Sequence, residues 1–221
     1  MAHDLRSPIG IVTSYTELLQ REWHTLSVEE IRELLAIIRR VGRKSLTIVE
    51  ELLLLASVRK GQVKMTALDM PRIVAEVQQR LGPMIEEYQA IVELPNDWPL
   101  AFGYGPWIEE IWTNYLSNAI KYGGQPPHIK LGAIKQGENM IRFWVQDNGN
   151  GLSLSEQAQL FIPFTRLNQV CVEGYGLGLS IVQRIVDKLG GEVGVESQAV
   201  MGQGSVFWFT LPANNQGVSP G

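Results

Sequence analysis

The sequence lacks several features that mark particular classes of protein. Its 221 residues include a single cysteine, Cys171, so no internal disulfide can form, which is usual in a reducing compartment. The formal net charge is −4, and without a basic excess there is no electrostatic footprint for nucleic acid. No apolar run is long enough to cross a bilayer, and no signal peptide is visible. These absences predict a cytoplasmic globular protein that does not bind nucleic acid.

What is present is enough to build one large domain or two small ones. Hydrophobic residues make up 45% of the chain, an ordinary share that can fill real cores. Histidines number only three, and one of them, His3, opens the chain in His3-Asp4-Leu5-Arg6-Ser7-Pro8. A motif so close to the start predicts a fragment that lacks upstream regions, including any part that attaches a membrane-bound sensor to its membrane.

The first sixty residues predict two helices joined by a short connection at Trp23–Leu26. Four apolar residues and a threonine line one face of the first helix at steps of four and three: Leu5, Ile9, Val12, Thr16 and Leu19. Pro8 lies inside this run and predicts either a kink or the first turn of the helix. The second helix is predicted to start at Ser27-Val28-Glu29-Glu30, which has the pattern of a capping box.

The second helix has an apolar face wider than one partner helix can cover. A heptad stripe runs along it: Ile31, Leu34, Ile38, Val41, Ser45, Ile48, Leu52 and Leu55. A second stripe widens the face: Leu35, Leu46, Val49 and Leu53. Two hairpins packed as a four-helix bundle would cover it, so the pattern predicts a homodimer through residues 1–61. The alternative is a hairpin that lies on the following domain.

From Lys64 onward short strands alternate with helices, which predicts an α+β sandwich with a mixed sheet over residues 62–213. Helices are expected at Pro71–Tyr88, Pro106–Tyr122, Leu154–Leu160 and Leu179–Leu189. Strands are expected at Val63–Leu68, Ile91–Leu94, Ile129–Ile134, Met140–Gln146, Gly191–Glu196 and Ser205–Leu211. The polar tail, residues 214–221, is expected to fray.

The predicted helix Pro106–Tyr122 carries three polar residues on one face. Asn114, Asn118 and Lys121 are spaced by four and three residues. Amide oxygens suit a hard cation such as Mg²⁺, and a lysine suits phosphate. Taken alone, an ordinary solvated helix face explains the same residues better.

Asp147-Asn148-Gly149-Asn150-Gly151 follows a predicted strand in which Ile141, Phe143 and Val145 alternate inward. Asp147 comes next in the same phase, so its carboxylate is expected at the edge of an apolar pocket. There it can accept a hydrogen bond from an exocyclic amine such as that of adenine. Gly149 and Gly151 let the backbone approach a ring closely. An ordinary turn is the alternative, because Asp-Asn-Gly is common in turns.

Gly174-Tyr175-Gly176-Leu177-Gly178 leads into a predicted helix and can present free N–H groups to phosphate. The loop is not a Walker loop, since no Gly-Lys-Ser/Thr follows it, and no strand precedes it as in a Rossmann fingerprint. By itself it is a weak signal.

The order of these segments resembles the core of a sensor histidine kinase of two-component signalling. His3–Pro8 resembles the H box and Asn114–Tyr122 the N box. The G1, F and G2 boxes are matched by Asp147–Gly151, Phe161-Ile162-Pro163-Phe164 and Gly174–Gly178. Gly202-Gln203-Gly204-Ser205 resembles the last glycine motif.

This resemblance implies an ATP-binding sandwich of the GHKL (Bergerat) type, which DNA gyrase and heat-shock chaperones share. It implies Mg²⁺ bound through Asn118 and adenine bound by Asp147. The remaining residues implied to bind nucleotide are Asn114, Lys121, Tyr122, Gly149, Gly151, Phe161, Phe164, Arg166, Gly174, Tyr175, Gly176, Leu177, Gly178 and Ser205. Residues 166–173 are implied to form a lid over ATP.

The resemblance also implies roles for the first box. His3 is the phosphoacceptor, and Asp4 is its general base or orienting carboxylate. Ser7, one turn after His3, stands where the family commonly has Thr or Asn and is a candidate for phosphatase activity. Asn114 stands where related hydrolases have the glutamate that activates water, and an amide is a poor base, so transfer to His3 is expected to prevail over hydrolysis.

The expected function is an ATP-dependent protein-histidine kinase that phosphorylates its own His3 and passes the phosphoryl group to an Asp of a response regulator. The alternatives are a degraded kinase that acts as a nucleotide-binding dimerisation or docking module, and a plain ATPase.

Overall fold

The computed structural model describes residues 2–60, 63–162 and 177–214. The chain divides into two compact units, Met1–Ser57 and Val58–Gly221. The predicted domains, 1–61 and 62–213, place their boundary a few residues further on and stay a prediction. No helix in the described ranges is both long enough and apolar enough to span a membrane.

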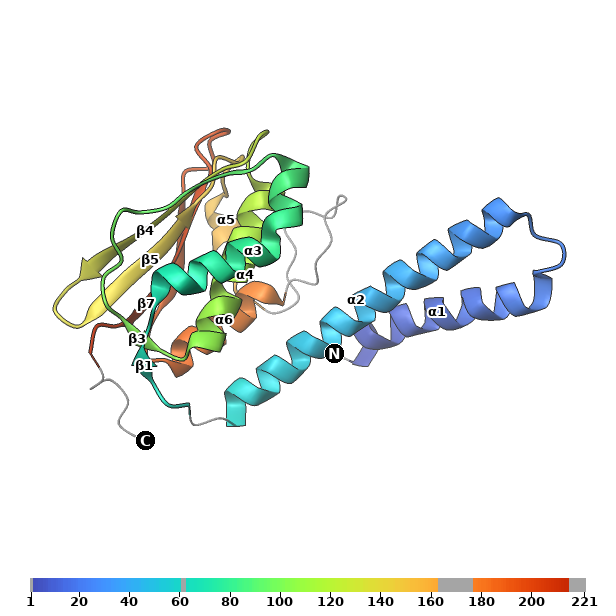
Figure 1. The fold of residues 1–221 in the computed structure, drawn as a ribbon, viewed down its shortest axis with the longest axis horizontal. Coiled ribbons are helices and arrows are strands. Elements are labelled where there is room, and N and C mark those ends of the chain that lie inside the picture. The colour runs from blue at the N-terminus through green and yellow to red at the C-terminus, as the bar shows by residue number, and fades with distance from the viewer. Residues whose placement is uncertain (1, 61–62, 163–176, 215–221) are drawn as a thin grey trace. The chain divides into compact units, whose positions relative to one another are not determined.

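The first unit is a helical hairpin, as the sequence predicts. Helices α1 (Ala2–Glu22) and α2 (Val28–Lys60) run back along one another (Figure 1), joined at Trp23–Leu26. Helix α1 continues through Pro8, so this proline does not mark its first turn. The capping box forms at α2: the Glu30 N–H donates to Ser27 Oγ (3.3 Å) and the Ser27 N–H to Glu30 Oε2 (2.7 Å).

The second apolar stripe of α2 is exposed in a single hairpin. The exposed fractions of Leu35, Leu46 and Leu53 are 52%, 62% and 65%. By contrast, Val41 of the heptad stripe is buried. One hairpin therefore leaves uncovered the side chains that the sequence assigns to a partner.

The second unit is an α/β sandwich with a mixed sheet, which confirms the predicted class. Its main sheet has the order β2-β4-β5-β7-β6, with β2 and β4 parallel and the other neighbours antiparallel. These strands are β2 (Ile91–Glu93), β4 (His128–Gln136), β5 (Met140–Gln146), β6 (Val193–Ser197) and β7 (Ser205–Pro212). A separate pair joins β1 (Thr66–Ala67) to β3 (Phe102–Gly103).

Helices α3 (Met70–Tyr88), α4 (Gly105–Tyr122) and α6 (Gly178–Lys188) lie together on one face of the sheet (Figure 1). Asp69 caps α3, since its carboxylate accepts the N–H of Arg72 at 3.2 Å. A short helix, α5 (Leu154–Gln157), begins with a capping box between Ser153 and Glu156.

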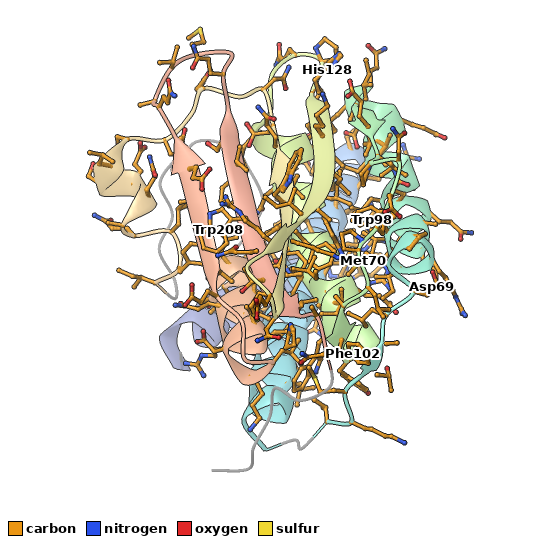
Figure 2. The ribbon with its side chains drawn as sticks, turned by 90° about the vertical axis from the view of Figure 1, so that its left-hand side faces the viewer. Asp69, Met70, Trp98, Phe102, His128 and Trp208 are labelled. Carbon is orange, nitrogen blue, oxygen red and sulfur yellow. The ribbon has the colours of Figure 1, made fainter. Side chains whose placement is uncertain are left out.

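The core between α4 and the sheet is aromatic. Trp112 of α4 and Phe143 and Phe209 of the sheet are fully buried. The Trp112 and Phe209 rings meet edge to face at 5.3 Å, and Phe143 stacks on Phe209 at the same distance. The Trp112 indole N–H donates to the sulfur of Met70 at 3.1 Å, which joins α3 to the same cluster; Met70 is labelled in Figure 2.

Three predicted elements differ from the structure, each for a local reason. The strand expected at Val63–Leu68 is only two residues long, and its partner β3 is too short to show any periodicity in the sequence. The helix expected at Leu154–Leu160 stops at Gln157, whose side chain donates instead to the carbonyls of Leu152 and Ser197. The last strand before β7 starts at Val193, because the Gly191 N–H bonds back to Val186 of α6.

The other face of the sheet carries two tryptophans that cover glycines of the neighbouring strands. Gly132, Trp144, Trp208 and Gly194 pair in one row across β4, β5, β7 and β6. A Cβ on Gly132 would lie 2.0 Å from Trp144 Cζ2, and one on Gly194 would lie 2.3 Å from Trp208 Cζ2. Arg142 stacks on Trp208 at 4.5 Å, and Figure 2 labels Trp208 on this face.

We expect Gly132→Ala to lower the free energy of unfolding by about 1–3 kcal/mol, because the new methyl group overlaps the Trp144 ring. In a Trp144→Ala background the same change should be neutral or slightly stabilising, because the overlap is gone. Urea unfolding of the four proteins of this double-mutant cycle measures the coupling. Additive effects would contradict the predicted overlap.

Candidate nucleotide site

Helix α4 presents its predicted polar residues on the side away from the sheet. Ile111, Trp112, Tyr115 and Leu116 are buried, whereas Asn114, Asn118 and Lys121 are partly buried. The apolar side anchors the helix, so its orientation sets the direction of the polar side. Tyr122, at the end of the helix, is exposed.

Asn114 is held in one orientation and contacts the start of α6. Its amide Nδ2 donates to the Glu110 carbonyl at 2.9 Å. Its Oδ1 faces Gly178, where a Cβ would lie only 2.0 Å away. Glycine is therefore needed at position 178 for this approach, which brings the predicted N and G2 boxes together.

Asn118 has an amide that is available to a ligand. Its side chain is partly buried and makes no hydrogen bond within the described ranges. The same ranges contain no group of three His, Cys, Asp or Glu side chains that could bind a metal ion. An amide oxygen together with waters and ligand phosphates suits Mg²⁺, which rarely uses a complete protein cage. The residues present therefore fit this ion.

Asp147 is a buried carboxylate held by two backbone donors. Its exposed fraction is 8%, and Oδ1 accepts the N–H of Gly149 at 2.8 Å and of Ser205 at 3.2 Å. Burial raises the pKa of this carboxyl, against the opposing effect of the two hydrogen bonds. Asp147 thus lies where the sequence predicts, next after the buried residues of β5, and its buried carboxylate can accept a hydrogen bond from a ligand.

The last glycine motif closes onto Asp147 from the neighbouring strand. The Asp147 N–H donates to the Ser205 carbonyl at 3.0 Å, and Gly202 and Gly204 donate to the Gly149 carbonyl. Gly204 has φ +63°, and a Cβ there would lie 1.9 Å from the Asp147 carbonyl oxygen. Ser205 is therefore placed beside Asp147 by its backbone, while its hydroxyl donates to Ser197.

The remaining predicted residues are placed in part. Gly151 has φ +73° and lies beside Ser197, Phe161 is partly buried, and Leu177 is buried at the start of α6. Predicted residues outside the described ranges are Phe164, Arg166, Gly174, Tyr175 and Gly176, together with the rest of the implied lid.

The first box lies in the other unit. The backbone of His3, Asp4 and Ser7 belongs to helix α1, and the positions of their side chains lie outside the description. Their predicted roles stay predictions.

Sequence reasoning missed the part played by Asn148. Its Oδ1 accepts the N–H groups of Gly124 and His128, both at 2.8 Å, and its Nδ2 donates to the Pro126 carbonyl at 3.1 Å. The signal in the sequence was the Gly123-Gly124 pair directly after the helix, which marks a close backbone approach.

A cavity of about 580 Å³ opens at the same end of the sheet, on the other face. Its strand residues Lys130, Gln146 and Val206 alternate with the buried Leu131, Val145 and Ser205. No residue of α4 lines this cavity, so the cavity is separate from the polar face of α4 that contains Asn114, Asn118 and Lys121.

Comparison with known proteins gives two family matches. Residues 1–61 match the His Kinase A (phospho-acceptor) domain. Residues 103–215 match the histidine kinase-, DNA gyrase B-, and HSP90-like ATPase family.

Similar curated proteins are longer than this chain. The adaptive-response sensory kinase SasA of Thermosynechococcus vestitus is 30% identical over 222 residues, which cover 96% of this chain and 58% of that kinase. The methanogenesis regulatory histidine kinase FilI of Methanothrix harundinacea is also 30% identical, over 96% of this chain and 24% of FilI. The chain thus spans little more than half of the first relative and a quarter of the second.

Solved structures share the fold. Histidine kinase AdeS of Acinetobacter baumannii has a TM-score of 0.73 at 22% identity, over 96% of this chain and 98% of that one. Histidine kinase ThkA, solved with response regulator protein TrrA, has a TM-score of 0.75 at 24% identity, over 97% of this chain and 60% of that one. A phosphoacceptor match on the hairpin followed by an ATPase match on the sandwich shows that the chain belongs to the sensor histidine kinases of two-component signalling.

Proposed function

We propose that the chain is an ATP-dependent protein-histidine kinase core that phosphorylates its own His3 and passes the phosphoryl group to an Asp of a response regulator. The observation that carries the proposal is the polar face of α4, where Asn114, Asn118 and Lys121 lie over an apolar anchor. This face belongs to the unit that matches the ATPase family, and the hairpin that matches the phosphoacceptor family contains His3.

We propose that Asp147 binds the adenine ring. A buried carboxylate whose Oδ1 is occupied by Gly149 and Ser205 presents its second oxygen to one further donor. The exocyclic amine of adenine is such a donor. Desolvation makes this hydrogen bond stronger than an exposed one, and a base without the amine would leave the second carboxylate oxygen without a donor.

At the other end of the nucleotide, Asn118 is the proposed Mg²⁺ ligand, and Lys121 and Tyr122 lie near the phosphates. The bound ion would neutralise charge on the phosphate oxygens. Asn118 supplies an oxygen without adding negative charge beside the triphosphate. Position 114 offers no base to a water molecule, because Asn114 carries a neutral amide, and the Glu110 carbonyl holds that amide in place.

The proposed transfer uses the imidazole of His3 as nucleophile. A ring nitrogen forms a bond to the γ-phosphorus while the bond to the β–γ bridging oxygen breaks, and ADP leaves. Asp4 is the proposed partner for the proton on the other ring nitrogen. An Asp of a response regulator then takes the phosphoryl group from His3. ThkA, whose structure includes a response regulator, supports a partner of this kind.

We also propose that two chains dimerise through the hairpin. Three exposed leucines of α2, Leu35, Leu46 and Leu53, recur at helical spacing on one side of the helix, where a second hairpin can bury them. In a four-helix bundle, each of these leucines packs against the apolar face of the second chain's hairpin.

Incubation with γ-labelled ATP tests the kinase. We expect acid-labile label on the wild type and none on His3→Gln, because the glutamine amide is not a nucleophile. The matched control is His24→Gln, an exposed histidine of the same hairpin, which should be labelled normally. Asn118→Ala should reduce the labelling rate on the order of a hundredfold. Label retained by His3→Gln would contradict the proposal, and ATP hydrolysis faster than labelling would favour the ATPase.

Asp147→Asn tests the adenine contact by opposing effects on binding and stability. The asparagine Oδ1 still accepts from Gly149 and Ser205, but its amide replaces the acceptor for adenine, so ATP affinity should fall at least about tenfold. Affinity of the wild type should also fall as pH drops through the raised pKa of Asp147.

Whereas Asp147→Asn should weaken ATP binding, it should stabilise the ligand-free protein relative to wild type as the pH rises. Since the folded-state pKa lies above the ordinary value, folding takes up a proton between the two values, and wild-type stability falls as pH rises through this window. Asp147→Asn removes that loss, so its stability relative to wild type should increase from about pH 4 towards neutral. Urea unfolding at several pH values measures the difference. A constant difference would contradict the predicted burial effect.

Sedimentation of Leu46→Lys/Leu53→Lys tests the dimer. Two ammonium groups in the apolar face should raise the dimer dissociation constant at least about a hundredfold. The control is Leu154→Lys, which changes an even more exposed leucine (84%) in the other unit and should leave dimerisation unchanged. Equal effects of the two variants, or none of either, would count against the hairpin interface.

A further inference from the structure

Asn148 joins three points of one loop to the segment that contains Asp147. Its Oδ1 accepts two backbone N–H groups, from Gly124 and His128, and its Nδ2 donates to the Pro126 carbonyl. The distances are 2.8, 2.8 and 3.1 Å. A side chain with three backbone partners on one loop fixes that loop more firmly than any single bond does.

The loop connects two elements that the site depends on. Gly123 caps the end of α4, immediately after Lys121 and Tyr122, and His128 begins β4 (Figure 2). The Pro127 carbonyl also accepts the N–H of Ile91, so the loop continues into the edge of the sheet. Asn148 therefore ties the last turn of α4 to the end of β5.

The loop after α4 and the segment after β5 approach so closely that Gly124 and Gly149 have no room for a side chain. A Cβ on Gly124 would lie 2.7 Å from Asn148 Nδ2, and a Cβ on Gly149 would lie 2.3 Å from the Tyr122 carbonyl oxygen. Both glycines permit backbone contact between the N-box end and the G1 segment. The contact is continuous from Asp147 to Tyr122.

We infer that Asn148 is a positioning residue that sets the distance between the base-binding carboxylate of Asp147 and the phosphate-binding end of α4. The inference rests on the proposed nucleotide site. Asp147 itself is held by Gly149 and Ser205, so loss of the Asn148 side chain leaves that carboxylate in place. What such a loss removes is the restraint on the loop that directly follows Lys121 and Tyr122, and so one of the contacts that hold the last turn of α4.

This separation of effects gives a signature that general destabilisation does not share. Asn148→Ala should weaken ATP binding about tenfold, because the phosphate end of the site is no longer held, and leave adenosine binding within about twofold. NMR titration of the folded variant measures both dissociation constants. In the ligand-free protein, the amides of Gly124 and His128 should lose protection from hydrogen exchange.

Two variants sharpen the comparison. Asn148→Asp keeps the acceptor for Gly124 and His128 but loses the donor to Pro126, so its ATP affinity should fall between wild type and Asn148→Ala. If Asn148→Ala does not fold, the same measurements on Asn148→Asp, ATP and adenosine affinity and amide protection, test the inference. Asn150→Ala is the matched control, because Asn150 is exposed and makes no side-chain hydrogen bond within the described ranges.

The outcomes separate this inference from the function on which it rests. Equal weakening of ATP and adenosine, or unchanged ATP affinity with the two amides still protected, would overturn the positioning role alone. Failure of the wild type to bind ATP or adenosine would overturn the proposed function together with it. Selective loss of ATP affinity in Asn148→Ala, with Asn150→Ala unaffected, supports it.

Discussion

The packing of α4 on the sheet is the interaction on which the rest of the second unit depends. Trp112 packs edge to face against both Phe143 and Phe209, which stack on each other, and all three rings are fully buried. The Trp112 indole N–H also donates to the sulfur of Met70. Aromatic contacts of this kind have preferred geometries, so they fix the rotation of the helix about its axis as well as its place. The direction of Asn114, Asn118 and Lys121 follows from that rotation.

A second constraint acts at the end of β5, where the chain changes from a strand into the turn Asp147–Gly151. Asp147 is held from within its own turn by Gly149 and from the next strand by Ser205. Asn148, its neighbour, reaches the opposite way to the loop after α4. Two adjacent side chains thus connect three segments far apart in the sequence, and the glycines around them permit backbone contacts that any Cβ would block.

The two units differ in how much of their stability lies within one chain. The second unit buries its apolar residues between helices and sheet, and it covers glycines of the other face with Trp144 and Trp208. The hairpin leaves Leu46 and Leu53 largely exposed. The proposed dimer accounts for this difference, since the hairpin's apolar face is then completed by its copy.

The sequence by itself determined the hairpin, the order of helices and strands in the sandwich, and the residue types of the site. These depend on local signals: the capping box at Ser27 and Glu30, the spacing along α4, and the alternation that leads from Ile141 to Asp147. The two-residue strand β3, which is held by a distant partner, had no such signal. Helix α5 was predicted, but its end at Gln157, whose side chain donates to the distant Ser197 carbonyl, was not. Only the tertiary structure decided that Gly178 lies on Asn114, that Ser205 supports Asp147 and that Asn148 holds the loop after α4. The physical reason is that these contacts join residues far apart along the chain, so their geometry exists only after the helices and strands have packed.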